Sequence, residues 1–244
     1  MKILVYFSLF LLSATIITSC MDMPYVPKRH QNSFSFCYQD KDTGIDSLLN
    51  INGYFRLKET PGATFGLDSS ISIEDTSYYY IMFFRDGIFL SGLRDLDRIG
   101  IPKYFEKVKR NTELGKKELF YKAFYWGTYK ISGDTIKTQV INLPSTGAPH
   151  SWALAENWYK VVDKSSIIKI YAKRLENGIV PYDFRKTPGN TYNVYGKVFT
   201  IWPGTFIYVP IIPGSDCWLK KEKWFWCNEE DWKKYKEKKS QKKH

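Results

Sequence analysis

The chain has 244 residues and a mass of 28.6 kDa, and 43% of its residues are hydrophobic, which is enough to build a folded core. This composition excludes a disordered or fibrous protein. Aromatic residues make up 17% of the chain, which favours a β-rich globular protein over a helical bundle. The formal net charge of +11 would suit a nucleic-acid partner, but the N-terminal residues direct the chain out of the cytoplasm.

The chain begins with the features of a secretory signal. Met1-Lys2 is a short positive segment, and the apolar run 3–17, about 15 residues long, is shorter than the roughly 20 residues that span a bilayer. The run ends in Ile17-Thr18-Ser19-Cys20, which resembles the lipobox of bacterial lipoproteins. That resemblance implies removal of residues 1–19 and attachment of diacylglyceryl and palmitate chains to Cys20. An ordinary secretory signal with an incidental thiol at Cys20 is the alternative.

Two or three acyl chains would hold the mature protein firmly on a membrane. We expect residues 20–32 to be the lipidated N-terminus and an extended, proline-containing linker. Residues 33–227 are expected to form one β-barrel domain, and residues 228–244 a basic helical tail. The expected location is the cell envelope, at the outer membrane, with the periplasmic and the surface face both left open.

Short β-like runs alternate with turn signals over residues 34–226, and they predict an antiparallel meander. The first clear hairpin follows the aromatic run 78–84, where Asp86-Gly87 is a favoured two-residue loop. A loop of that length would pair Phe84 with Phe89. The result would be an aromatic ladder across the two strands.

The hairpin with the clearest register lies around Gly133-Asp134. Its tight loop would pair Ile131 with Ile136 on one face of the sheet. Lys130 and Lys137 would then share the opposite face, as alternation requires of a sheet with one wet side.

A third hairpin is expected around residues 163–166. In the predicted register Tyr159 and Ile168 share one face. Lys160 and Lys169 share the other face, which is exposed to water. Together with the other two hairpins, this one predicts a continuous meander.

Helices are expected to be few. Residues 101–110 begin with a proline in the first turn and place three apolar residues on one side, which predicts one short helix. After residue 227, Asn228 is a good N-cap, the three acids that follow suit the positive end of a helix, and lysines from Lys233 onward suit its negative end. A short C-terminal helix is therefore predicted, fraying near Ser240.

Four sequence segments, in this order behind a lipobox, resemble the lipocalin-like lipoproteins of Gram-negative bacteria. They are Ile51-Asn52-Gly53-Tyr54-Phe55, Phe83-Phe84-Arg85-Asp86-Gly87, the segment 126–136 with the sequence WGTYKISGDTI, and the segment 218–226 with the sequence WLKKEKWFW. The resemblance implies a calycin-type antiparallel barrel or half-barrel and no established activity. Residues 93–110 and the tail after Asn228 depart from the family pattern.

Catalytic chemistry has little support in this sequence. Only His150 of the three histidines lies inside the expected domain, and zinc motifs, P-loops and dinucleotide fingerprints are missing. We therefore predict no metal and no cofactor, and expect a binding or structural protein rather than an enzyme. The alternative is a glycan-acting envelope hydrolase with paired carboxylates, for which the candidates are Asp86, Glu118, Asp134 and Glu156.

Aromatic residues give the main indication of function. An eight-stranded barrel is just wide enough to hold one small ligand, and aromatic rings stack on sugars and pack on lipid tails. An apolar or glycan ligand is therefore expected, although the same residues could simply fill a small barrel. The candidate lining residues are Tyr78, Tyr80, Phe84, Tyr121, Tyr125 and Trp126.

Lysines are concentrated at the C-terminal end of the chain. Residues 219–244 contain ten lysines and five acids, a net +5 of the total +11. Outside the cytoplasm, anionic lipids and acidic glycans are the partners that such a tail would find, whereas nucleic acid is excluded by compartment. A solvated tail that only aids solubility is the alternative.

Three cysteines remain in the mature chain besides Cys20, so one disulfide can form and one thiol is left. All three pairings of Cys37, Cys217 and Cys227 are open. A hairpin centred on Glu222 would place Cys217 opposite Cys227, a possible disulfide. If residues 218–226 form one straight strand, as the family resemblance suggests, these two cysteines lie about 33 Å apart and cannot be bonded.

Overall fold

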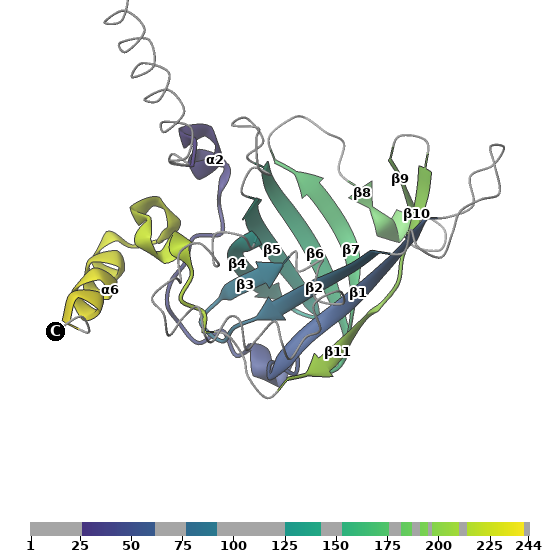
Figure 1. The fold of residues 1–244 in the computed structure, drawn as a ribbon, viewed down its shortest axis with the longest axis horizontal. Coiled ribbons are helices and arrows are strands. Elements are labelled where there is room, and N and C mark those ends of the chain that lie inside the picture. The colour runs from purple at the N-terminus through teal and green to yellow at the C-terminus, as the bar shows by residue number, and fades with distance from the viewer. Residues whose placement is uncertain are drawn as a thin grey trace, which may run out of the picture.

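The computed structural model describes residues 26–61, 77–91, 125–142, 153–175, 182–186, 191–194, 197–209 and 214–241. Within these ranges the strands form one antiparallel sheet that curls into a barrel (Figure 1). The barrel strands are β1 (Gly53–Pro61), β2 (Ser77–Phe83), β3 (Ile88–Ser91), β4 (Tyr125–Ser132), β5 (Thr135–Asn142), β6 (Ala153–Asp163), β7 (Ser166–Arg174) and β11 (Gly204–Tyr208). Beside this ring, β8 (Tyr182–Asp183) pairs with β7, and β10 (Lys197–Ile201) pairs with both β1 and β9 (Thr191–Val194).

The ring closes because β11 pairs on both of its sides. Gly204 lies opposite Ile167 of β7, and Tyr208 lies opposite Gly53 of β1. The strands β1 to β7 follow one another around the ring in chain order, which makes the topology an antiparallel meander. These pairings confirm the predicted mainly β fold class and antiparallel meander. Of the expected barrel or half-barrel, the chain forms the closed barrel, an architecture consistent with a lipocalin-like fold.

The hairpin between β4 and β5 has the predicted register. Ile131 lies opposite Ile136, and Tyr129 lies opposite Thr138. The two strands also approach closely at Gly127, where an added Cβ atom would lie 1.8 Å from the carbonyl oxygen of Gln139. Only glycine fits at that position without moving the partner strand.

The hairpin between β2 and β3 differs from the prediction by one residue. Phe83, and not Phe84, lies opposite Phe89. The loop has three residues instead of two: the amide of Phe84 donates to the carbonyl of Ile88 at 3.0 Å, and Gly87 ends the loop with a φ of 88°. Because side chains alternate along a strand, Phe84 lies on the opposite face from Phe83, and the shift means that Phe83, not Phe84, shares a face with Phe89.

The hairpin between β6 and β7 also differs from the prediction. Tyr159 lies opposite Lys169, and Lys160 lies opposite Ile168, with register shifts beside Trp158 and after Val161. The prediction that Tyr159 shares a face with Ile168, and that Lys169 faces water with Lys160, is therefore wrong. The cause is a β-bulge, which adds one unpaired residue and exchanges the two faces of a strand.

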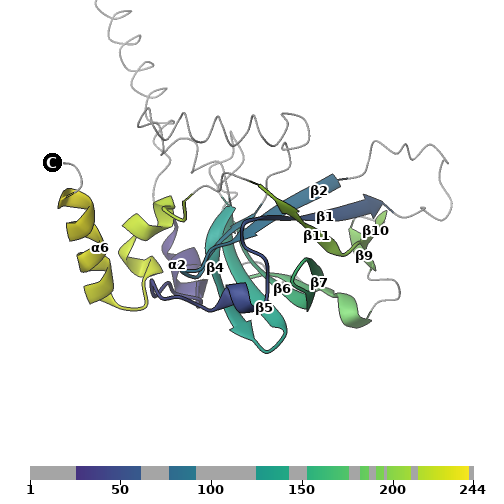
Figure 2. The ribbon, with the colours of Figure 1, turned by 90° about the horizontal axis from the view of Figure 1, so that it is seen from below.

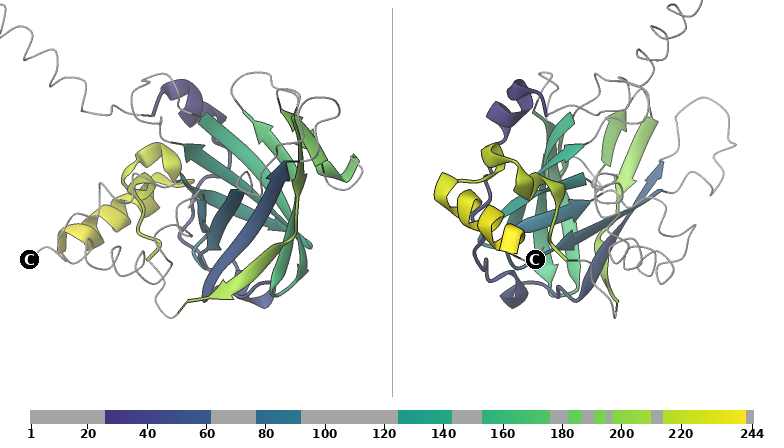
Figure 3. Two further views of the ribbon diagram at one scale, coloured as in Figure 1. Left: turned by 45° about the vertical axis from the view of Figure 1, so that its right-hand side comes forward. Right: turned by 60° about the vertical axis from the view of Figure 1, so that its left-hand side comes forward.

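Two terminal segments cover one outer face of the barrel, on the same side of the molecule (Figures 2 and 3). The N-terminal segment contains α2 (Lys28–Ser33), and the C-terminal segment contains the 3₁₀ turns η5 (Trp218–Lys221) and η6 (Lys223–Phe225), followed by α6 (Glu229–Gln241). Residues 28–32 of the expected extended linker are thus helical. The straight strand that the resemblance suggests for residues 218–226 is not formed, because η5 and η6 turn the chain there.

A disulfide joins the two terminal segments. It links Cys37 to Cys227, and beside it the amide of Cys227 donates to the carbonyl of Tyr38 at 2.9 Å. The suggested pairing of Cys217 with Cys227 is therefore wrong. Residues 217–227 form neither the hairpin nor the straight strand considered from the sequence. The N-terminal segment runs beside residues 225–227 instead, which brings Cys37 next to Cys227. The Cys217 thiol is free and buried.

The C-terminal helix confirms the predicted one. The Asn228 side chain caps it by accepting a hydrogen bond from the Glu230 amide at 2.8 Å. Trp232 and Tyr235 pack toward the barrel, although the helix buries no residue completely. No helix within the described ranges has the length and apolar character needed to cross a membrane. The helix predicted at residues 101–110 lies outside the described residues.

Candidate functional site

One set of buried side chains fills the interior of the barrel. Phe83 of β2 and Tyr159 of β6 lie on strands that are not neighbours in the ring, yet their ring centroids are 6.4 Å apart. Such a contact is possible only across the interior. The barrel-interior cluster to which both belong consists of Ile45, Leu49, Phe55, Leu57, Ile81, Phe83, Phe89, Tyr129, Ile136, Val140, Tyr159 and Ile167.

A second set lies outside the barrel wall, beneath the two terminal segments. This outer-face cluster contains Phe34 and Tyr38 from the N-terminal segment and Leu219, Phe225 and Trp226 from the C-terminal segment. Four of the six aromatic residues expected to line a ligand cavity belong to this outer face and not to the interior, namely Tyr78, Tyr80, Phe84 and Trp126. Tyr125 packs against the barrel-interior cluster, and Tyr121 lies outside the described residues.

One end of the barrel interior is closed by the segment that precedes β1. Ile45 in the 3₁₀ turn η1 (Ile45–Ser47) and Leu49 after it are fully buried in the barrel-interior cluster. The amide of Asn50 donates to the carbonyl of Lys164 at 2.8 Å, which fixes this segment to the β6–β7 hairpin. This segment therefore covers the apolar end of the interior.

Away from the η1 end, the interior becomes polar. The inward residues of β1 are Phe55, then Leu57, then Glu59, and those of β7 are Ile167 and then Lys169, because alternate residues face inward. Glu59 is only 5% exposed, whereas Lys169 keeps part of its exposure. We call Glu59, Tyr79, Tyr159 and Lys169 the polar layer.

The members of the polar layer act on one another electrostatically. Burial lowers the pKa of Lys169, and the negative charge of Glu59 opposes that effect. Burial also raises the pKa of Tyr159, with a further rise from Glu59 and then from Tyr79. A carboxylate, an amine and a phenol hydroxyl are thus held together in a region of low dielectric constant, where hydrogen bonds and charges act strongly.

An aromatic ring borders the polar layer. The Nζ atom of Lys169 lies 5.9 Å from the ring centroid of Phe184, which begins the 3₁₀ turn η3 (Phe184–Lys186). The Phe184 ring stacks on Tyr182 of β8, with centroids 6.4 Å apart and planes inclined by 9°. The polar layer therefore has hydrogen-bonding groups and an aromatic surface next to each other, the combination that binds sugars and other small molecules with one polar and one apolar side.

The polar layer was not predicted from the sequence. Alternation without a bulge assigns Lys169 to the solvent-facing side, together with Lys160, and no motif marks Glu59. One signal that could have identified Lys169 is its position within the apolar run 167–171, IIKIY. A single lysine between apolar residues on both sides is unusual, because lysine is rarely buried.

The candidate carboxylates of the alternative hydrolase do not form a pair in the described residues. Asp86 accepts hydrogen bonds from Ser215 and Lys220 on the outer face. Glu156 binds the side chains of Gln139 and Trp158, also outside the barrel. Asp134 lies in an exposed turn 3.8 Å from the Lys160 ammonium group, and Glu118 lies outside the described residues.

Within the described ranges, His, Cys, Asp and Glu side chains do not gather in any group of three that could hold a metal ion.

Comparisons with known proteins give no family for the chain: it matches no protein-family model, and searches of curated proteins and of solved structures find no similar protein. The lipocalin-like description of the barrel rests on its own strand order and closure.

Proposed function

We propose that this protein is a lipid-anchored lipoprotein of the bacterial cell envelope whose barrel binds one small ligand at the polar layer. The observation that supports the proposal most strongly is the inward position of Glu59 and Lys169. Placing two ionisable groups inside a barrel filled mainly by apolar side chains costs stability, and hydrophobic residues of similar volume would avoid that cost. Binding a polar group of a ligand gives a reason to keep them.

The proposed ligand is a small, uncharged molecule that carries hydroxyl groups beside an apolar surface, such as a sugar. Glu59 accepts hydrogen bonds and Lys169 donates them, and their opposite charges leave the site nearly neutral. Phe184 is itself buried, but Tyr182, which stacks on it, is half-buried and offers a ring on which a sugar could stack. Of the ligand classes expected from the sequence, this favours the glycan over a purely apolar molecule. Binding, not catalysis, is the proposed role.

The proposed location in the envelope rests on two features. The first is the sequence Ile17-Thr18-Ser19-Cys20, which predicts lipid attachment at Cys20. The second is the disulfide between Cys37 and Cys227, since such bonds persist outside the reducing cytosol. Incorporation of labelled palmitate, with Cys20→Ala as control, tests the anchor: equal labelling of the variant would contradict it.

Ligand binding is tested by titrating the ¹⁵N-labelled protein with mono- and disaccharides from the bacterial cell wall. We expect amide shifts concentrated on β1, β6 and β7 around Glu59, Tyr159 and Lys169. Glu59→Gln and Lys169→Met should each weaken the affinity at least tenfold, about 1.4 kcal/mol, because each removes a charged hydrogen-bonding group.

The matched control is Lys173→Met, which changes the same residue type on the same strand at an exposed position. It should leave the affinity unchanged. Shifts confined to the outer face of the barrel, or equal affinities of the Lys169 and Lys173 variants, would contradict the proposed site.

A further inference from the structure

The second half of α6 is a compact basic surface. Lys233, Lys234, Lys236 and Lys238 are all exposed, and Glu237 is the one acid among residues 233–241. The other three acids of α6, Glu229, Glu230 and Asp231, lie in its first turn, where they stabilise the positive end of the helix. Glu229 lies 3.4 Å from the Lys233 ammonium group and Asp231 lies 3.8 Å from that of Lys234, both in exposed ion pairs, so the excess positive charge is carried by the lysines that follow. Positive charge is therefore concentrated toward the end of α6 that points away from the barrel (Figure 1).

Contacts fix this helix in one orientation. The Tyr235 hydroxyl donates to Asp216 at 2.8 Å, its ring lies 5.4 Å from that of Trp226, and the Trp232 indole donates to the carbonyl of Lys221 at 3.1 Å. These contacts occupy the inner side of α6, so the exposed lysines stay on its outer side.

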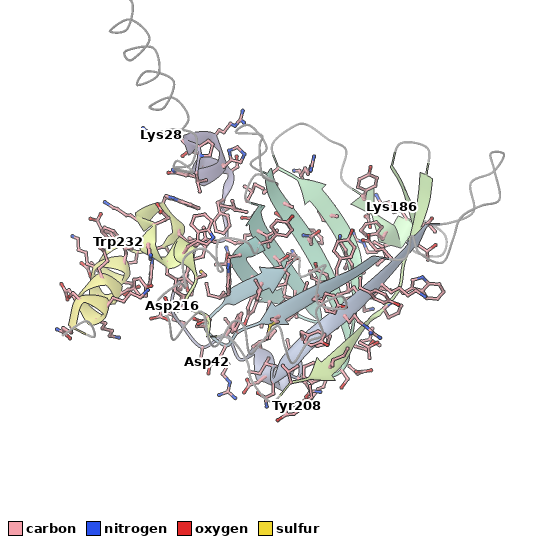
Figure 4. All side chains as sticks on the ribbon, viewed as in Figure 1. Lys28, Asp42, Lys186, Tyr208, Asp216 and Trp232 are labelled. Atoms are coloured by element: carbon pink, nitrogen blue, oxygen red, sulfur yellow. A yellow bond between two sulfur atoms is a disulfide. The ribbon has the colours of Figure 1, made fainter. Side chains whose placement is uncertain are left out.

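The basic helix is also covalently linked to the N-terminal segment. The Cys37–Cys227 disulfide lies at the residue before the α6 cap, and Tyr38 pairs with Trp226 beside it. Helix α2 adds the exposed side chains of Lys28 and Arg29. Lys28 lies on the same side of the molecule as Trp232 of α6 (Figure 4). Val26 follows Cys20 by six residues, which span at most about 22 Å.

We propose that α2 and α6 form a single membrane-facing surface, and that it rests on the anionic phospholipid bilayer into which the lipid on Cys20 is inserted. The inference deepens the proposed function, because it rests on the lipid anchor. Basic clusters beside an anchor bind anionic bilayers by charge attraction, and the lipid keeps this surface at the bilayer for as long as it stays inserted. The disulfide prevents the basic helix from separating from the anchor.

This contact gives the barrel a defined orientation. Lys186 of η3, beside the polar layer, lies on the opposite side of the molecule from Trp232 of α6 (Figure 4). The ligand site would then face away from the bilayer, toward the aqueous compartment. A water-soluble glycan, as proposed above, could reach it there.

Lysine footprinting on the lipidated protein tests the orientation directly. The full lipoprotein is placed in vesicles containing phosphatidylglycerol or in neutral detergent, and treated with a membrane-impermeant amine reagent. We expect modification of Lys233, Lys234 and Lys238 to slow at least threefold in the vesicles. Lys164 and Lys186 are the exposed internal controls and should react at equal rates in both. Equal rates at α6, or protection of the controls, would overturn the proposal.

Vesicle sedimentation of the unlipidated chain from residue 20, carrying Cys20→Ser, separates the charge contact from the anchor. Replacing Lys233, Lys234, Lys236 and Lys238 by Gln should reduce binding to phosphatidylglycerol vesicles at least tenfold. The matched variant replaces Lys160, Lys164, Lys173 and Lys186, which are also exposed and give the same net charge, and should bind like the parent chain. Equal loss in both variants would mean that only total charge matters, which contradicts a membrane-facing surface.

Two other outcomes are distinguishable. If mass spectrometry finds Cys20 unmodified but the lysine-dependent binding to vesicles remains, the proposed lipid anchor is wrong, while the proposed contact of α6 with the bilayer is supported. If the unlipidated chain binds a soluble acidic polysaccharide through the same lysines but does not bind vesicles, the partner is a glycan and the bilayer proposal is wrong. Loss of vesicle binding at high salt is expected, since exposed charges are screened over about 8 Å at physiological ionic strength.

Discussion

The Nζ atom of Lys220 lies 2.7 Å from the Oδ2 atom of Asp86, and this pair joins the C-terminal segment to the β2–β3 turn. Both side chains are largely buried, with 8% and 22% exposure. The same carboxylate accepts a hydrogen bond from Ser215 at 2.6 Å and lies 3.0 Å from the Tyr38 hydroxyl. One carboxylate therefore connects three segments that are far apart in the sequence.

Asp86→Ala is expected to lower the free energy of unfolding by about 3 kcal/mol, because it leaves the largely buried Lys220 ammonium without its carboxylate counter-ion. Urea denaturation measures the change. Asp134→Ala is the control, because its ion pair with Lys160 is exposed and longer, at 3.8 Å, and should contribute less than about 1 kcal/mol. Equal destabilisation by the two substitutions would contradict a structural role for the buried pair.

Removal of the disulfide is expected to destabilise the fold without changing it. The bond closes a loop with a sequence separation of 190 residues, and cross-links of such loops contribute about 4 kcal/mol by restricting the unfolded chain. The double variant Cys37→Ser, Cys227→Ser should therefore melt about 10 °C lower. A melting temperature unchanged within about 2 °C would show that the two terminal segments do not need the cross-link.

Cys217 is expected to resist alkylation in the folded protein. Its side chain is buried, and this desolvation raises the pKa of the thiol to about 12, so little thiolate exists at pH 8. Iodoacetamide should label the native protein at least a hundredfold more slowly than the urea-unfolded protein. Labelling of the native chain at the rate of a free thiol would contradict the burial of this residue.

Stability should fall above about pH 10. Burial raises the pKa of Tyr38, Tyr129 and Tyr159 well above the ordinary tyrosine value near 10. In the unfolded chain these hydroxyls ionise near pH 10, so their contribution to stability is fully present below that pH and is lost as the pH rises. The free energy of unfolding should decline by up to about 1.4 kcal/mol per pH unit for each of them. Chemical denaturation at pH 8 to 11 measures it, and Tyr159→Phe should reduce the slope.

Deletion of the chain from Lys233 should cost about 1 to 2 kcal/mol of unfolding free energy, because Tyr235 contacts Trp226 and Asp216. Tyr235→Ala should cost about the same, since it removes the same contacts. Thermal melts of both variants decide this. A much larger loss for the deletion would mean that other residues of α6 support the barrel.

Local chemistry allowed part of the fold to be predicted. The β4–β5 register follows from Gly133-Asp134, and the α6 boundary follows from the Asn228 cap and the acids after it. The predicted β2–β3 register was wrong because Asp86-Gly87 is compatible with loops of two or three residues, and with the three-residue loop Phe83 instead of Phe84 shares a face with Phe89. The choice between them depends on packing over the whole wall.

The candidate site could not be predicted for a similar reason. Lys169 faces inward only because of the β6–β7 bulge, and Glu59 gains its role only when closure of the ring places it in the interior. The pairing of Cys37 with Cys227 depends on two distant segments that meet on the outer face. Each of these relationships joins residues on different strands or segments, so none of them produces a local sequence pattern from which it could be predicted.

Native mass spectrometry of the protein purified from its own envelope tests the proposed ligand site most directly. We predict one bound small molecule with the mass of a neutral, hydroxyl-bearing compound, retained in Lys173→Met and lost in Lys169→Met. A ligand-free protein, or a bound molecule that persists in Lys169→Met, would contradict the claim that the polar layer inside the barrel is its binding site.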